Sequence, residues 1–305
     1  MHTTSGRWRL GLALSLVAVF MWGILPIGLM VILQVLDVYT LIWFRFLLSF
    51  VLLFVYLGWR GKLPTLERLR STSWMLLAIA ILGLAANYIL FTQGLALTAP
   101  TNAEVIIQIA PLLLGFGGLF IFRERYTLLQ WIGVSTLIVG FTLFFHEQLK
   151  NLVTAHGQYI LGSGLVVVGA VAWTFYALAQ KQLLQSLSSP SIMLIIYAGC
   201  ALLFTPFANP KAIFTLNPFH LGMLIFCAFN TLIAYGAFAE SLEHWEASRV
   251  SAVSALTPIV TLISIWLLSV IVPTLILPEN ISFIGIMGAV LVVTGSVTIA
   301  LGKAR

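Results

Sequence analysis

The residues of this chain that could do chemistry are amides and indoles placed inside long apolar runs. Asn87, Gln108 and Asn230 are the amides, and Trp22 and Trp173 are the indoles. Each lies within about one helical turn of the middle of its run. An amide in an apolar environment is costly unless it is paired or faces water. These groups therefore predict a central cavity that holds a small molecule through neutral polar and aromatic contacts.

Patterns for covalent or metal chemistry are missing from the sequence. The five histidines lie in tails or turns without metal-ligand spacing, and neither a GxSxG nor an HExxH motif occurs. Cys200 and Cys227 fall inside separate apolar runs and predict neither a disulfide framework nor a metal site. We expect no cofactor, and an intramembrane enzyme is a minor alternative.

The composition is that of an integral membrane protein. Of 305 residues, 61% are hydrophobic and 8% are charged, and the mean hydropathy is +1.08. Ten apolar runs are long enough to cross a hydrocarbon core of about 30 Å as helices, and nothing alternates like a barrel strand. The predicted helices are 10–33, 38–57, 74–97, 102–122, 127–145, 159–183, 190–207, 219–242, 248–272 and 281–302.

Several of these runs have a recognisable start. Asp37, Ser189 before Pro190, and Asn217 before Pro218 predict N-caps, two of them followed by a first-turn proline. Two pairs have capping-box spacing, and they are Thr101 with Glu104 and Thr127 with Gln130.

The chain contains an internal duplication. Residues of the first half recur 147 to 155 positions later, and the change of offset locates an insertion before the last helix. The halves are 10–146 and 159–302, each with five predicted helices, and an odd number turns the second half upside down in the membrane. Inverted repeats are typical of secondary carriers with a site near the midplane. Matching pairs include Trp22 and Trp173, Tyr88 and Tyr235, Leu95 and Leu242, Pro111 and Pro258, and Gly133 and Gly288.

Basic residues predict the orientation. With the N-terminus inside, eleven Lys and Arg residues lie in inner segments and only Lys150 and Lys211 lie outside. Both termini are then cytoplasmic, in a plasma or inner membrane. The net charge of +6 is a topology signal and not a nucleic-acid footprint, because the basic residues cluster at helix ends.

The candidate cavity residues share midplane depth or follow helical spacing on the same faces. Two interpretations stay open for them: they line a cavity, or they pack and hydrogen-bond between helices. The same choice applies to the small polar stripe of Ser251, Ser254 and Thr261. The cavity candidates are Trp22, Asn87, Tyr88, Gln108, Trp173, Tyr176, Asn230 and Tyr235.

Charge inside the predicted helices is sparse. Arg45 and Glu104 lie one to two turns below the outer ends of their helices. They form either a structural ion pair or an outer gate with a proton-sensitive carboxylate. Since the midplane level then carries amides, indoles and phenols only, we expect a neutral or zwitterionic ligand with some apolar surface.

The sequence resembles the EamA branch of the drug/metabolite transporter superfamily over residues 8–302. The residues that carry the resemblance are Trp22-Gly23, Arg45 within its apolar helix, the turn after Ala96-Leu97 with Pro111, Arg123-Glu124-Arg125, and paired glycines in the fifth and tenth helices. Pro26 and the long loop before the last helix depart from the pattern.

The resemblance implies a ten-helix carrier that moves amino acids or similar metabolites, often outward. We therefore predict alternating access by a monomer or homodimer in the lipid bilayer. A proton or a counter-substrate is the candidate coupling partner, and a channel is the other alternative.

Topology can be tested directly. A reporter fused after Arg305 should behave as cytoplasmic and one inserted after Asn151 as external, because ten spans return the chain to its starting side. Activity of paired alkaline phosphatase and fluorescent-protein fusions measures this. An external C-terminal reporter would contradict the span count.

Overall fold

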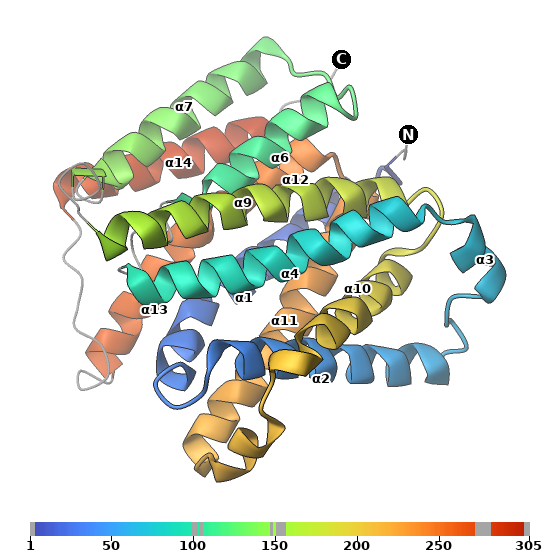
Figure 1. The fold of residues 1–305 in the computed structure, drawn as a ribbon. Helices are drawn as coiled ribbons and strands as arrows, with labels where there is room; N and C mark the ends of the chain where they lie inside the picture. The colour runs from blue at the N-terminus through green and yellow to red at the C-terminus, as the bar shows by residue number, and fades with distance from the viewer. Residues whose placement is uncertain are drawn as a thin grey trace.

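The structure is a computed structural model that describes residues 4–98, 103, 106–146, 149–150, 157–271 and 282–301. Within these ranges all regular secondary structure is helical (Figure 1). The helices are α1 (Trp8–Ile32), α2 (Val38–Trp59), α3 (Leu66–Ser71), α4 (Trp74–Leu97), α6 (Ile109–Phe120), α7 (Leu128–Phe144), α9 (Gln158–Leu183), α10 (Ser189–Phe204), η1 (Thr205–Phe207), η2 (Pro210–Thr215), α11 (Pro218–His244), α12 (Ala247–Ser254), α13 (Thr257–Ile271) and α14 (Phe283–Leu301).

The helix lengths fit a membrane protein. In the described residues, eight helical stretches are long and apolar enough to cross a membrane, with α12 and α13 forming one stretch. α6 and α7 are apolar but shorter, with 12 and 17 residues. The predicted continuous ninth helix is wrong, because it breaks into α12 and α13 at residues 255–256. In the fourth predicted helix, the described chain turns at Gln108 before α6 begins.

Several start signals act as predicted. The Asp37 carboxylate accepts a hydrogen bond from Thr40 N (2.9 Å), and Asn217 Oδ1 accepts one from His220 N (2.9 Å). Thr127 forms the reciprocal capping box of α7 with the residue three positions later. The N-cap of α10 is Ser188 and not Ser189, which is already helical. The predicted box at Thr101 lies outside the described residues.

Glycines set the closest helix contacts. α7 runs antiparallel to α14, with Gly133 opposite Gly295 and Gly140 opposite Gly288. α4 runs antiparallel to α9, with Gly94 opposite Gly162, and α1 packs along α11 (Figure 1). Because lipid gives helices little hydrophobic reason to associate, small residues that let backbones approach are what holds such pairs together.

The helix ends define two faces of the molecule. The start of α1 lies against Trp245 after α11, and the end of α14 lies near Arg249 of α12, whose Nη1 donates to Ala300 O (3.4 Å). The α6–α7 loop and the end of α9 meet the same region. We call this the basic face because its loops include Arg7 and Arg123. The first and last described helices therefore share a face.

The glycine contacts are testable by adding a single methyl group. A Cβ at Gly288 would lie 2.3 Å from Phe144 N and 2.8 Å from Gly140 O, both backbone atoms that cannot rotate away. Gly288→Ala should cost about 1–3 kcal/mol of stability through overpacking. Thermal unfolding in detergent measures this. The control is Gly222→Ala in α11, where a Cβ meets nothing within 4 Å; equal melting temperatures for both variants would contradict the packing account.

Candidate functional site

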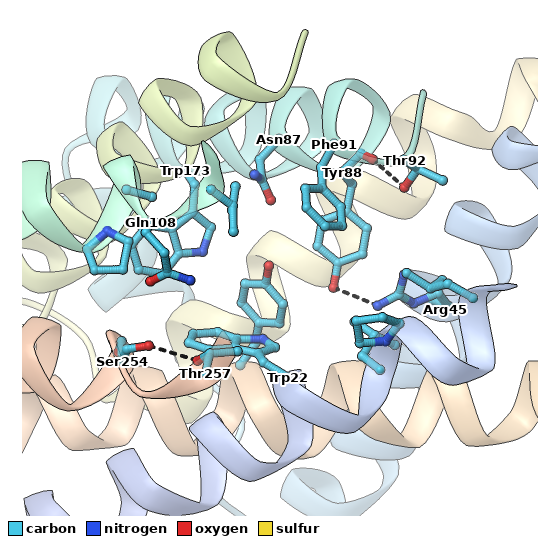
Figure 2. A pocket seen from close by; sticks show the side chains of 17 residues that line it. Trp22, Arg45, Asn87, Tyr88, Phe91, Thr92, Gln108, Trp173, Ser254 and Thr257 are labelled. Carbon is cyan, nitrogen blue, oxygen red and sulfur yellow. Dashed lines mark hydrogen bonds between the residues drawn. The ribbon is translucent and has the colours of Figure 1, made fainter. Parts of the chain in front are cut away.

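A cavity lies between the halves of the molecule, with room of about 120 Å³ for water-sized centres. That is enough for several water molecules, so the space is larger than a packing defect. Figure 2 shows side chains from α1, α2, α4, α9, α11 and the broken helices converging on it. Its lining comprises Trp22, Leu25, Pro26, Leu29, Arg45, Asn87, Tyr88, Phe91, Thr92, Ile107, Gln108, Ala110, Pro111, Trp173, Tyr235, Ser254 and Thr257.

The break between α12 and α13 brings polar groups to the cavity. Pro258 has no N–H, so it cannot donate to the carbonyl of Ser254 four residues earlier. The Thr257 hydroxyl donates to that carbonyl instead, at 2.8 Å. Both Ser254 and Thr257 line the cavity as a result. The proline thus explains the break and the polarity at the same place.

The first half has a matching interruption. Pro111 is the counterpart of Pro258, and the chain turns at Gln108 just before α6. The two interrupted helices touch, since the Ser251 hydroxyl of α12 donates to the Pro111 carbonyl. Interrupted helices at corresponding positions of two repeats are the usual mark of a carrier's binding site.

Six predicted residues line the cavity: Trp22, Asn87, Tyr88, Gln108, Trp173 and Tyr235. The indoles of Trp22 and Trp173 meet edge to face, with ring centroids 5.9 Å apart, and Tyr235 lies 5.3 Å from Trp22. We call Trp22, Trp173 and Tyr235 the aromatic floor. It marks the end of the cavity nearest the basic face, because the other α1 residues in the lining follow Trp22 toward the opposite face.

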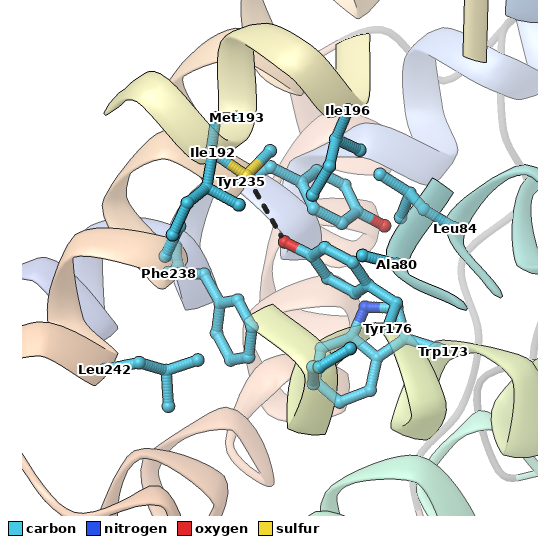
Figure 3. Close-up of a cluster of buried hydrophobic side chains, with 14 of the residues drawn as sticks. Ala80, Leu84, Trp173, Tyr176, Ile192, Met193, Ile196, Tyr235, Phe238 and Leu242 are labelled. Carbon is cyan, nitrogen blue, oxygen red and sulfur yellow. Dashed lines mark hydrogen bonds between the residues drawn. The ribbon is translucent and has the colours of Figure 1, made fainter. Parts of the chain in front are cut away.

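Tyr176 is not part of the lining. It is fully buried one helical turn beyond Trp173 toward the basic face, beneath the aromatic floor. Its hydroxyl lies 3.6 Å from Met193 Sδ, and its ring packs against Tyr235 and Phe238 (Figure 3). The prediction that it lines the cavity is wrong because it packs in the hydrophobic core.

Asn230 is also absent from the lining. It is fully buried, and its Nδ2 donates to the Met21 carbonyl, which links α11 to α1. Asn87 makes the corresponding link between α4 and α9, where Nδ2 donates to the Gly169 carbonyl at 3.0 Å. Of these two amides, only Asn87 also reaches the cavity, and Figure 2 shows its oxygen pointing inward.

Arg45 lines the cavity, contrary to the expectation of a site without charged side chains. It is buried, its Nε donates to Thr231 Oγ1 (2.9 Å), and its guanidinium lies 4.7 Å from the Tyr88 ring. Counting along the helix located its backbone, but the long side chain reaches inward. Glu104 lies outside the described residues, so the pairing of Arg45 with Glu104 stays a prediction.

The sequence analysis missed two polar lining residues and one network. Thr92 and Thr257 line the cavity; Thr257 is the repeat counterpart of Ala110, which also lines it, so the repeat offset could have found it. The missed network joins Glu124 to Lys181, and no spacing pattern predicts a contact across 57 positions.

The Glu124 network closes the basic face. Glu124 Oε1 lies 2.9 Å from Lys181 Nζ, and the side chains are 10% and 2% exposed. The same carboxylate accepts hydrogen bonds from Ala247 N (2.8 Å) and Ser248 N (3.0 Å) at the start of α12. One carboxylate therefore joins the α6–α7 loop, the end of α9 and the broken helix.

The environment keeps Glu124 ionised. Burial is the largest influence and by itself would raise the pKa of this carboxyl, but the Lys181 ammonium and hydrogen bonds from Ser248 hold the pKa below its usual 4.5. Burial raises the pKa of nearby Tyr126 to about 12, so that phenol stays neutral at physiological pH. The closed network is thus a carboxylate and ammonium pair with neutral surroundings.

An apolar helical protein with interrupted helices around a buried central cavity has the architecture of a membrane transporter. The chain belongs to the EamA-like transporter family, whose model matches residues 9–146 and again residues 160–301.

Curated relatives agree with this class. The chain is 36% identical to the "Uncharacterized inner membrane transporter YhbE" of Escherichia coli K12, over 96% of this chain and 92% of the relative. It is 34% identical to an "Uncharacterized transporter" of Haemophilus influenzae, over 96% and 95%. It is 25% identical to a "Probable amino-acid metabolite efflux pump" of E. coli K12, over 63% and 64%. A solved structure titled "Crystal structure of protein" shares the fold, with a TM-score of 0.72, 17% identity, and coverage of 97% and 99%.

A double-mutant cycle tests the Glu124–Lys181 pair. Removing one partner leaves a buried charge, so Glu124→Gln or Lys181→Met alone should each cost about 3 kcal/mol or more. The double variant should cost less than the sum of the two. Denaturant or thermal unfolding in detergent measures the coupling. Glu246→Gln is the control, because the more exposed pair with Arg249 should contribute less than about 1 kcal/mol.

The same pair predicts a pH dependence. A carboxyl whose folded pKa is depressed stabilises the protein above its unfolded pKa, and this contribution is lost as the pH falls through the folded pKa. The stability difference between wild type and Glu124→Gln should be constant near neutral pH and shrink below 4.5. Melting temperatures across this range measure it, and a difference that grows on acidification would contradict the pairing.

Proposed function

We propose that this protein is a secondary carrier that moves a small neutral or zwitterionic metabolite, such as an amino acid, out of the cell by alternating access. The observation that carries the proposal is a cavity built from equivalent residues of the two halves. Trp22 and Trp173 both line it, as do Tyr88 and Tyr235. A site at the junction of two repeats can be exposed to either side by moving one repeat against the other.

Helix packing supports an inverted repeat of ten spans. α7 and α14 are counterparts, and they run antiparallel with Gly133 opposite Gly295 and Gly140 opposite Gly288. Because Gly133 corresponds to Gly288 and Gly140 to Gly295, these two contacts exchange when the halves exchange. The contact of α4 with α9 likewise has its counterpart in that of α11 with α1. We propose 10–146 and 159–302 as the two repeats.

Alternating access fits the asymmetry of the cavity. The aromatic floor and the Glu124–Lys181 pair separate the cavity from the basic face, whereas Leu29, Phe91 and Thr92 extend its wall toward the opposite face. A channel would need a continuous passage, and these layers interrupt one. In our proposal, the opposite state forms when the Glu124 contacts to Lys181 and α12 break.

The direction and the partners rest on weaker analogies. A relative named as an amino-acid metabolite efflux pump supports outward movement of a metabolite. With the basic face cytoplasmic, both termini lie inside the inner or plasma membrane. We propose a monomer or homodimer in the bilayer, coupled to a proton or to a counter-substrate.

Paired substitutions on one helix test the site. Trp173 lies in the aromatic floor and is buried, whereas Phe175, two residues on, is 57% exposed on the lipid side. Trp173→Ala should lower transport per folded molecule by roughly tenfold or more, because a floor contact of about 1–3 kcal/mol is lost, and Phe175→Ala should not.

The measurement is uptake and counterflow of radiolabelled metabolites in proteoliposomes, normalised to folded protein. Counterflow distinguishes a carrier from a channel, since only a carrier exchanges labelled for unlabelled substrate against a gradient. Full normalised activity of Trp173→Ala, with lowered thermal stability, would mean that the floor serves packing alone.

A further inference from the structure

We propose that Arg45 is the binding residue for a carboxylate group of the substrate, so that the cavity takes small monocarboxylates with an apolar or aromatic body. This inference deepens the proposed function and rests on it. It assigns a chemical role to the only charged side chain among the residues that line the cavity in the described part of the chain.

The guanidinium of Arg45 has neutral partners only, within the residues that the structure describes. Nε donates to Thr231 Oγ1 (2.9 Å) and Nη2 to the Tyr88 hydroxyl (3.5 Å), and the group lies over the Tyr88 ring. An arginine side chain has five N–H donors, and these bonds use two of them. The remaining donors are available to an acceptor that enters the cavity.

A buried guanidinium stays charged and gains most from an anionic partner. Its pKa lies far above neutrality, so it does not escape the cost of burial by losing a proton. Arg45 is 2% exposed, and neither Tyr88 nor Thr231 carries a compensating charge. A carboxylate fits this site best, because its two oxygens match the planar fork of N–H groups.

The rest of the cavity has a different character, which gives the ligand a direction. Tyr88 lies 5.6 Å from Tyr235, which in turn lies 5.3 Å from Trp22 (ring centroids). This row leads from Arg45 to the aromatic floor (Figure 2). Such a wall suits an apolar or aromatic body, and it also accommodates an amino group by cation–π contact. The fit is therefore to amino acids with apolar side chains and to their monocarboxylate analogues.

Matched ligands test this on the unmodified protein. The probes are L-leucine and L-phenylalanine, their primary amides, and their analogues without the amino group, 4-methylpentanoate and 3-phenylpropanoate. Binding to the full chain in detergent is measured by calorimetry and by thermal shift. At least one free acid should bind about tenfold or more tightly than its amide, because only the acid offers the charged acceptor. Removing the amino group should matter less.

Variants then assign the preference to Arg45. Arg45→Gln should reduce the acid-to-amide affinity ratio to near one, and Arg45→Lys should give an intermediate ratio because it keeps the charge and loses the fork. A purely structural role of Arg45 would weaken acid and amide alike and leave the ratio unchanged. If Arg45→Gln does not fold, the wild-type ratio and Arg45→Lys still decide the matter.

The outcomes separate the two proposals. Amides that bind as tightly as acids, or no binding by any free acid, overturn the assignment of Arg45. Transport that shows counterflow but no carboxylate preference overturns it too and leaves the carrier function standing. A carboxylate preference in binding without any counterflow supports the assignment and contradicts the transport mechanism.

Discussion

The missing backbone donors of Pro111 and Pro258 constrain the rest of the structure. A proline leaves the carbonyl four residues earlier without its helical hydrogen bond, and lipid offers no substitute. An interrupted helix is tolerated at membrane depth only where protein or a water-filled cavity surrounds the break. The two interruptions therefore belong in the interior, where the Ser251 hydroxyl ties α12 to the Pro111 carbonyl. The cavity lies where these breaks meet.

Comparison of the two halves of the sequence located most of this site. Trp22 and Trp173, and Tyr88 and Tyr235, are repeat counterparts with similar depth in their helices, and all four line the cavity. Depth can be counted from the ends of an apolar run because each residue adds 1.5 Å. The membrane class and the helical fold follow from composition and run length. These parts depend on local sequence and could be predicted from it.

The errors concern the direction of side chains and contacts across the chain. Each helical residue turns by about 100°, so a small error in rotation moves a side chain from the cavity to a neighbouring helix. Asn230 and Tyr176 have suitable depth, yet they bond to Met21 and pack near Met193. Arg45 enters the cavity through its length. The Lys181–Glu124 pair depends on how α9 meets the α6–α7 loop, which no local pattern encodes.

The closed basic face is balanced between favourable and unfavourable terms. The Glu124 carboxylate has an ion pair and two backbone donors, which favour closure. Next to this network, Gln180 Nε2 and Oε1 and Trp245 Nε1 are buried without hydrogen-bond partners among the described residues. Each unmade bond costs about 1–3 kcal/mol, which offsets part of the gain. Opening this face would hydrate these groups while it breaks the ion pair. A small difference between the two states is what a carrier requires, because a ligand shifts such an equilibrium only by its differential affinity for them.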